Sequence, residues 1–230
     1  MPSTQKIVFF MGCACCTAVS VALLGYAMST KWAQTRVECR GLVSDTFNGT
    51  GVITWDLFSG TFDSNFCPFI GNSVEFKVFE KIKDSGAPAV LYVLVVFLLC
   101  LCLVFSALSI LIALYNSVSN PYETYMGPIG VYICSSISAS VSALVLILFA
   151  VAVSATNMAE SVILGQAEGT AVEMRNRQAT FYAGYFLVIP YTILSLASIA
   201  VIYMYDHAAY THRREQQRPT EDAPKEIMMY

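Results

Sequence analysis

The feature that most constrains this chain is a long uncharged run between Asp84 and Glu160. Of the 75 residues between these two acids, only Glu123 carries a charge. A helix needs roughly 20 apolar residues to cross the hydrocarbon core of a bilayer, whereas no soluble fold requires so long a run without charge. The run is therefore long enough to cross a membrane twice, with a connection in between.

The connection lies at residues 116–128, which contain Pro121, Pro128, Gly127 and two asparagines. These residue types break helices and form turns. The segments on either side, residues 87–115 and 128–154, are therefore predicted to form a helical hairpin through the membrane.

Two further segments have the same character. Residues 7–30 form an uncharged run of 24 residues between Lys6 and Lys31, and residues 181–205 lie in an uncharged run of 28 residues. The first run is longer than the roughly 7–15 residues of a signal-peptide core, so a retained membrane helix is favoured over a cleaved signal. With 56% hydrophobic and 13% charged residues, the chain is predicted to be an all-α membrane protein with a four-transmembrane-helix bundle.

The polar segments between these helices are expected to lie outside the membrane. Within residues 31–86, polar and apolar side chains alternate at 32–40, 52–58 and 74–78, which predicts a small antiparallel extracellular sheet. A short helix is expected between Phe79 and Gly86. Residues 155–180 are expected to form a second extracellular loop, in which Glu173 and Arg177 have the spacing of a helical ion pair. Residues 206–230 are charged and lack an apolar face, which predicts a disordered cytoplasmic tail.

Three residues of the first polar segment indicate the side of the membrane that it occupies. Asn48 begins the only Asn-x-Thr glycosylation sequon, and Cys39 and Cys67 are the only cysteines outside the apolar spans. Glycosylation and disulfide formation both occur in the secretory lumen, so this segment is expected to face the lumen and then the cell exterior. A Cys39–Cys67 bond would contribute roughly 3–4 kcal/mol to a sheet that lacks a large core of its own.

The basic residues after the fourth helix agree with this orientation. Arg213, Arg214 and Arg218 follow that helix closely, and cytoplasmic flanks of membrane helices are enriched in arginine and lysine. Because four spans bring both ends of the chain to the same side, the N- and C-termini are predicted to be cytoplasmic.

The membrane-embedded part is expected to lack reactive chemistry. No predicted span has an ionisable Asp, Glu, Lys, Arg or His in its interior, whereas pumps, transporters and channels usually place such groups at membrane depth. The serine-rich stretch 135–142 is expected to pack against other helices rather than to line a pore. His207 and His212 lie in the tail, so no catalytic, metal or cofactor site is predicted. A net charge of −3 argues against a nucleic-acid partner.

Two features leave alternatives open. The first is a group of three cysteines in the first helix: Cys13, Cys15 and Cys16. Their side chains either pack against neighbouring helices or, as the alternative, are palmitoylated near the cytoplasmic interface. The second is the C-terminus, which is either the end of a plain tail or a peptide that adds a strand to the groove of a PDZ domain: Met228, Met229 and Tyr230.

Several motifs of this chain resemble those of one family. Residues 115–132, with the sequence YNSVSNPYETYMGPIGVY, are similar to the inter-helix loop and third-helix start of the clarins, a branch of the claudin-like tetraspan membrane proteins. The N-terminal MPSTQK looks similar as well, and the tail around EQQRP at 215–219 looks most like that of the third clarin. Residues 55–60, WDLFSG, resemble the family's aromatic-Gly-Leu-Phe-x-Gly motif, with Asp56 in place of the usual glycine.

The resemblance implies a claudin-like fold, a plasma-membrane location and, as in some clarins, a role in sensory cells, synapses or actin organisation. The leading hypothesis is a non-enzymatic scaffold or accessory subunit that packs against other membrane proteins in the lipid bilayer. The alternative is a claudin-like cell–cell adhesion or junction protein. Claudins place both loop cysteines after the matching motif, whereas Cys39 precedes it here, which disfavours a paracellular seal.

Overall fold

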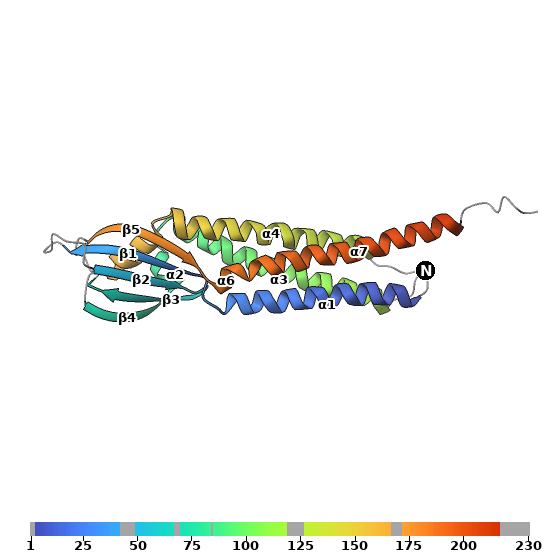
Figure 1. The fold of residues 1–230 in the computed structure, drawn as a ribbon, viewed down its shortest axis with the longest axis horizontal. Coiled ribbons are helices and arrows are strands. Elements are labelled where there is room, and N and C mark those ends of the chain that lie inside the picture. The colour runs from blue at the N-terminus through green and yellow to red at the C-terminus, as the bar shows by residue number, and fades with distance from the viewer. Residues whose placement is uncertain are drawn as a thin grey trace, which may run out of the picture.

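The computed structural model consists of a long helix bundle with a β-sheet at one end (Figure 1). It describes residues 3–41, 49–66, 70–83, 85–118, 127–166 and 172–216. Four of the described helices are long and apolar enough to cross a membrane: Thr4–Met28, Ala87–Val118, Gly127–Ala155 and Ala183–Ala208. The prediction of four apolar helices beside a small sheet is therefore confirmed.

The four spans form a ring. Helix α1 (Ser3–Met28) packs against α3 (Ala87–Val118) and α7 (Val188–Gln216), and α4 (Gly127–Ala155) also lies between α3 and α7. The last span begins with a short helix, α6 (Ala183–Phe186), and breaks at Leu187. Pro190 explains this break, because proline has no N–H to donate to the carbonyl oxygen four residues earlier.

The sheet contains five antiparallel strands in the order β4-β3-β2-β1-β5. Their bounds are β1 Ala33–Gly41, β2 Gly49–Trp55, β3 Ser59–Asn65, β4 Ile70–Lys77 and β5 Val172–Phe181. Strands β1, β2 and β4 were expected from the sequence, whereas β3 and β5 were not. The segment 155–180, expected to be a loop, instead forms α5 (Met158–Gln166) and the edge strand β5, which pairs with β1.

The expected helical ion pair between Glu173 and Arg177 is wrong, because both residues lie in strand β5. Glu173 instead bonds Arg40 of the neighbouring strand β1, at 2.6 Å. The guanidinium of Arg177 donates to the carbonyl oxygens of Ser154 and Thr156, at and just after the C-terminal end of α4. A helix leaves its last carbonyl oxygens without partners, and this arginine supplies donors for them.

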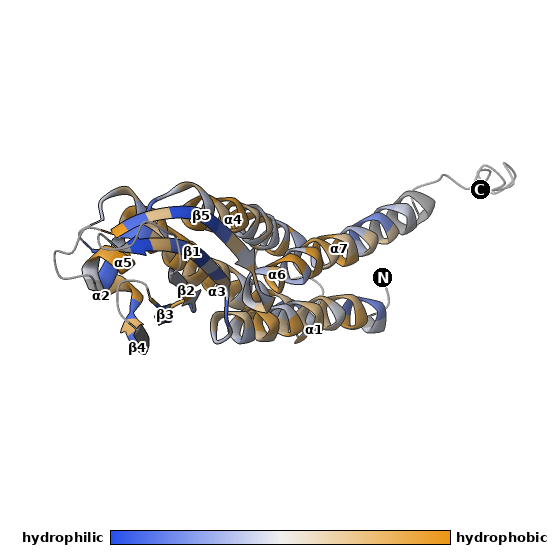
Figure 2. Ribbon diagram, turned by 60° about the vertical axis from the view of Figure 1, so that its left-hand side comes forward, coloured by the Kyte–Doolittle hydropathy of each residue, from blue (hydrophilic) through white to orange (hydrophobic). Residues whose placement is uncertain are grey.

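One hydrophobic core joins the sheet to the bundle. The inner face of the sheet packs on α5 and on the short helix α2 (Val78–Ile82), and the same core continues between α3, α4 and α7. Figure 2 shows hydrophobic residues over the membrane helices and hydrophilic residues concentrated on the strands. The sheet is thus held on the bundle by a shared core, with its outer face turned away from the helices that cover the inner face.

The last helix is longer than expected. The span was expected to end at Tyr205, with disorder from Asp206, but α7 continues to Gln216. Residues 206–216 contain no proline or glycine, and extending a helix that has already formed costs far less than nucleating one. Residues 217–230 of the predicted tail lie outside the described residues.

Candidate functional site

Two buried tryptophans lie where the sheet meets the bundle. The indole N–H of Trp32 donates to the carbonyl oxygen of Ala27 at 2.8 Å, and that of Trp55 donates to the hydroxyl of Thr35 at 2.9 Å. The Trp32 ring also meets Phe149 of α4 edge-on, with ring centroids 4.9 Å apart. Both rings are buried and both N–H groups have acceptors, so Trp32 joins the sheet to α1 and α4 and Trp55 joins β2 to β1.

The turn between β2 and β3 carries the WDLFSG motif of residues 55–60. It lies against the N-terminal part of α3 and against α2. The main-chain N–H of Asp56 donates to the carbonyl oxygen of Ser59 at 3.0 Å, and Val78 donates to Phe58 at 3.2 Å. Leu57 is fully buried in the shared core. Among the described residues, only Phe66 and Asn176 are non-glycine residues with positive φ, so Asp56 occupies the usual glycine position without left-handed strain.

Hydroxyl pairs connect the helices inside the bundle. Ser106 pairs with Tyr191 at 2.8 Å, and Thr17 with Ser198 at 3.1 Å. The serine-rich stretch of α4 is used in the same way: its bonds to neighbouring helices are Ser135–Ser109 at 3.3 Å and Ser142–Thr192 at 2.8 Å. Ser135, Ser138 and Ser142 are buried in the bundle, in agreement with the packing role expected for the stretch, whereas Ser136 and Ser140 are exposed. Among the described residues there is no cluster of His, Cys, Asp or Glu of a size that could hold a metal ion.

The lipid-facing side of α1 differs from that of α3. Exposed small residues follow each other three or four positions apart along α1, and therefore share one face: Cys15, Ala18, Ala22 and Gly25. The larger side chains of Val19 and Tyr26 are exposed beside them. A methyl group added at Gly25 would meet no atom within 4 Å. The exposed face of α3 is bulky by comparison: Val90, Val93, Phe97, Val104, Leu108 and Leu111.

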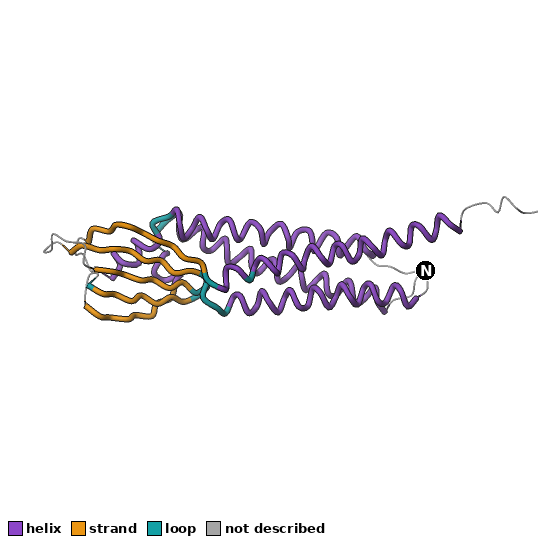
Figure 3. The backbone as a smooth tube through the Cα atoms, in the orientation of Figure 1, coloured by secondary structure: helices purple, strands orange, loops and turns teal. Residues whose placement is uncertain are grey.

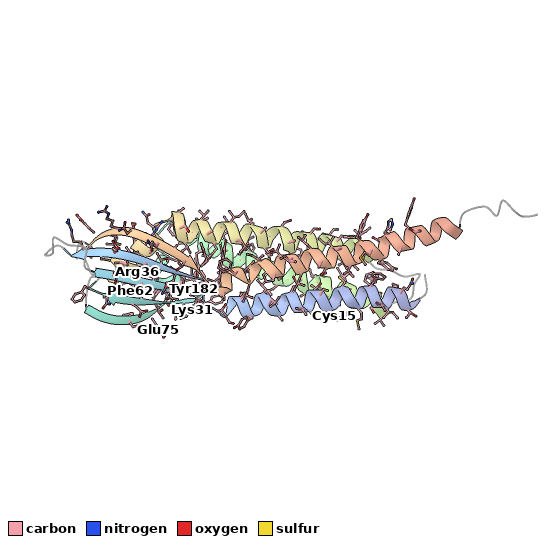
Figure 4. The ribbon with its side chains drawn as sticks, viewed as in Figure 1. Cys15, Lys31, Arg36, Phe62, Glu75 and Tyr182 are labelled. Carbon is pink, nitrogen blue, oxygen red and sulfur yellow. The ribbon has the colours of Figure 1, made fainter. Side chains whose placement is uncertain are left out.

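The three cysteines of α1 have different environments, although the sequence presents them together. Cys13 is buried against α7 and Cys16 is half-buried, whereas Cys15, labelled on α1 in Figure 4, is exposed on the small-residue face. All three are free thiols. Cys15 lies 12 residues from the first described residue of the helix, or about 18 Å at 1.5 Å per residue, which places it near the middle of the span rather than at the interface.

The outer face of the sheet carries charged residues from four strands. Some of them already have partners: Arg40 bonds Glu173 at 2.6 Å, and Glu38 accepts a 2.8 Å bond from Asn176. Arg36 and Asp63 make no ion pair within the described part of the chain. Local sequence could not have revealed this difference, because each pairing depends on which strand lies next to which.

The predicted site residues divide into two groups. Cys39 lies in β1 with its side chain buried on the inner face of the sheet. Cys67, Asn48 and the C-terminal residues Met228, Met229 and Tyr230 lie outside the described residues. The other six cysteines, all in α1, α3 or α4, are free. The disulfide, the glycan and the PDZ ligand therefore stay predictions.

Four long apolar helices that carry a small antiparallel sheet define a multi-pass, four-span membrane protein. A family model described as Clarin-2-like matches residues 4–181. The chain is 30% identical over 234 residues to Clarin-3 of Mus musculus and 27% identical over 232 residues to Clarin-3 of Homo sapiens, in both cases over the full length of both chains. It is 29% identical over 182 residues to Clarin-1 of Homo sapiens, which covers 75% of this chain and 76% of the relative. The chain belongs to the clarin family, as its motifs indicated.

Proposed function

We propose that this clarin is a non-enzymatic scaffold or accessory subunit of the plasma membrane, and that α1 packs against a helix of another membrane protein. The observation that carries the proposal is the exposed small-residue face of α1. Small residues let two helix backbones approach closely, which is the main source of attraction between helices in lipid. A face of this kind gains little from contact with lipid chains alone.

The other small or polar helix faces are partly occupied within the chain. Ser135 and Ser142 of α4 pair with α3 and α7, and Thr17 of α1 pairs with α7, whereas Ser136, Ser140 and Ala143 of α4 are exposed. The bulky exposed side chains of α3 suit contact with acyl chains instead. The outer face of α1, which exposes two alanines and a glycine at helical spacing, is the face proposed here to recognise a second membrane protein.

The topology proposed with this function places the sheet outside the cell. The first described residues of α1 and the end of α7 lie at the end of the bundle opposite the sheet (Figure 1), so both termini share the other side, which is cytoplasmic in this proposal. A Cys39–Cys67 disulfide and a glycan on Asn48 would then form in the lumen. Both polar segments, residues 31–86 and 155–180, contribute strands to one sheet. With the sheet outside the cell, this arrangement would be claudin-like.

The cytoplasmic end offers a second attachment. Helix α7 extends to Gln216, beyond its membrane-spanning part, which ends at Ala208. The final Met228, Met229 and Tyr230 are proposed to bind a PDZ-domain protein, which would connect the membrane complex to the cytoskeleton-linked layer below it. Removing these three residues is expected to abolish capture by purified PDZ domains; unchanged capture would contradict the proposal.

The test of the accessory role is extraction of the full chain in mild detergent, followed by native-size analysis and identification of co-purified proteins. A stoichiometric membrane protein is expected. Ala22→Leu is expected to reduce its recovery about tenfold or more, because a bulky side chain on the small face separates the two helices. Ala107→Leu is the matched control, since Ala107 is an exposed alanine on α3.

Two results would contradict this proposal. Recovery of the chain alone, at the size of a single copy or of a self-assembly, would remove the accessory role. A partner recovered equally with wild type and Ala22→Leu would show that α1 is not the binding face. Ala107→Leu must retain the partner for either comparison to hold.

Cell–cell adhesion is the second candidate, and the edges of the sheet favour it. Strands β4 and β5 each have one side without a neighbouring strand in the described part of the sheet, and such edges present main-chain N–H and C=O groups to other chains. Expression in non-adherent cells is expected to cause aggregation if this candidate is correct. Cells that stay dispersed while displaying the protein at their surface would exclude it.

A further inference from the structure

One row of side chains on the outer face of the sheet is complementary to itself. The strand register places Arg36 of β1 beside Val52 of β2, and Val52 beside Asp63 of β3. All three residues alternate with buried neighbours and so point away from the inner core; Arg36 and Asp63 are exposed and Val52 is half-buried. A cation and a carboxylate thus lie at the same height, one strand to either side of an apolar residue.

Neither charge of this row is used within the described part of the chain. Arg36 and Asp63 take part in none of its ion pairs or side-chain hydrogen bonds. The rows on either side are different, since Gln34 accepts a 2.8 Å bond from Tyr182 and Glu38 accepts one from Asn176. The row of Arg36, Val52 and Asp63 is therefore the one in which both charges are available to a partner.

We propose that two copies of this chain pair face to face through this row, about a two-fold axis that runs along β2. Such an axis exchanges β1 and β3, so it brings Arg36 of each copy opposite Asp63 of the second copy. Two equivalent ion pairs form, and the two Val52 side chains meet at the axis. A two-fold interface requires a surface that is complementary to itself, and this row meets that requirement at the level of single residues.

The direction of the axis determines where the two copies lie. The strands run along the long axis of the bundle (Figure 3), so an axis parallel to β2 lies near the membrane normal. Both bundles then lie at the same end of the pair, and both copies belong to one membrane. The arrangement cannot join two cells, which separates it from the adhesion candidate above.

The accessible face of the sheet also has room for this contact. The inner face is covered by α2 and α5. The outer face carries the exposed Arg36 and Glu75, which Figure 4 shows on strands in opposite halves of the sheet. Five strands about 4.8 Å apart, with about seven residues at 3.3 Å each, give a face of roughly 550 Å². This is less than the roughly 800 Å² per partner of a stable complex in solution, so the pairing depends on the high local concentration within a membrane.

The experiment is disulfide cross-linking of the full chain in intact membranes. Val52→Cys places a thiol at the axis, and mild oxidation is expected to give a covalent dimer on a non-reducing gel. Ser73→Cys is the matched control, because Ser73 is an exposed residue of the same row on β4, two strands from β2. It is expected to give no cross-link above the parent chain. Failure of Val52→Cys to cross-link, or equal yields for the two variants, would overturn the proposal.

Charge reversal supplies the second arm of the test. In the Val52→Cys background, Arg36→Asp and Asp63→Arg each place like charges together and are expected to lower the cross-link about tenfold or more. Co-expression of the two reversed chains restores both ion pairs and is expected to restore the cross-link between them. This rescue also shows that each variant folds. Two reversed chains that stay unlinked on co-expression would overturn the proposal.

Two further comparisons separate this inference from the proposed function. Mixing cells that express differently tagged Val52→Cys chains is expected to give no mixed dimer, whereas co-expression in one cell gives it; a mixed dimer between cells would overturn the same-membrane arrangement. Ala22→Leu is expected to leave the cross-link unchanged, because α1 is not part of the sheet. Loss of the cross-link in Ala22→Leu would show that α1, not the sheet, drives the pairing.

Discussion

The phenol of Tyr92 in α3 donates a 2.8 Å hydrogen bond to the main-chain carbonyl oxygen of Asp56. Tyr92 is fully buried, and its ring meets Phe79 of α2 edge-on with centroids 5.8 Å apart. Asp56 belongs to the turn between β2 and β3. This single bond therefore connects the sheet to a membrane helix at the same turn that carries the clarin-like motif.

Replacing Tyr92 by phenylalanine is expected to lower the free energy of unfolding by about 1–3 kcal/mol, because it leaves the Asp56 carbonyl oxygen without its donor. The melting temperature of the purified protein in detergent should fall by several degrees. Tyr182→Phe is the matched control: it removes a 2.8 Å bond to Gln34 from an exposed tyrosine, where water replaces the donor. Equal shifts for the two variants would contradict the assigned role of Tyr92.

The close approach of Gly184 to Trp32 gives a second prediction. A Cβ atom on Gly184 would lie 2.6 Å from Cδ1 of Trp32 and 2.9 Å from the carbonyl oxygen of Lys31. Trp32 is fully buried and cannot move without disturbing the junction, so Gly184→Ala is expected to destabilise the fold by about 1–3 kcal/mol.

Gly25→Ala is the control for this substitution, since an added methyl group there meets no atom within 4 Å. Alanine is also the better helix former, so Gly25→Ala is expected to leave the melting temperature unchanged or to raise it slightly. A Gly184→Ala variant that melts with the wild type would show that the α6–Trp32 contact is looser than the structure indicates.

The membrane helices could be predicted from sequence because the bilayer imposes a local requirement on length and polarity. Strands β1, β2 and β4 were predicted because polar and apolar side chains alternate clearly in them. Strand β3 was missed because Gly60 and Ser64 occupy two inner positions beside Phe62, which leaves little apolar contrast. In β5 the register shifts at Asn176, so a single period does not continue through the strand.

The candidate surfaces were less predictable, for a different physical reason. The row of Arg36, Val52 and Asp63 exists only because the turn at residues 56–58 sets the register between β2 and β3, and no residue pattern within one strand specifies that register. Small residues occur throughout α1, but of the exposed ones only Cys15 was singled out from the sequence. Which of them face lipid depends on how α3 and α7 pack against α1.

The predicted disulfide and glycan give a test of topology. Because Cys39 is buried in the sheet, Cys39→Ser and Cys67→Ser are each expected to slow migration on a non-reducing gel to the same degree and to reduce stability by roughly 3–4 kcal/mol. The double variant should be no less stable, and should migrate no more slowly, than either single variant. Cys15→Ser, which replaces a free thiol in α1, is expected to leave both properties unchanged.

Asn48→Gln tests the same orientation independently. Enzymatic removal of N-linked glycan should increase the mobility of the wild-type band, and Asn48→Gln should abolish that shift, because the chain has no other Asn-x-Thr sequon. A wild-type protein that carries no glycan after expression in a secretory host would contradict an extracellular sheet. The cysteine variants would then be expected to behave as the wild type on a non-reducing gel.

The irregular register of β5 explains how Arg177 reaches the end of α4. Val37 lies where the β1–β5 register shifts, between Arg36 opposite Gln178 and Glu38 opposite Arg175. Asn176 has a φ of 53°, and this extra residue rotates the strand so that Arg177 points to the carbonyl oxygens of Ser154 and Thr156. A cation at a helix C-terminus also interacts favourably with the helix dipole.

Arg177→Ala is expected to destabilise the protein by about 1–2 kcal/mol, because it removes both the bonds to the end of α4 and the favourable charge. Arg177→Lys should recover only part of this loss, since an ammonium group cannot reproduce the planar fork of a guanidinium. The measurement is thermal unfolding in detergent, with Arg175→Ala as the control, because the exposed Arg175 makes no ion pair in the described part of the chain. If Arg175→Ala and Arg177→Ala lower the melting temperature equally, the loss reflects general surface charge and not the cap on α4.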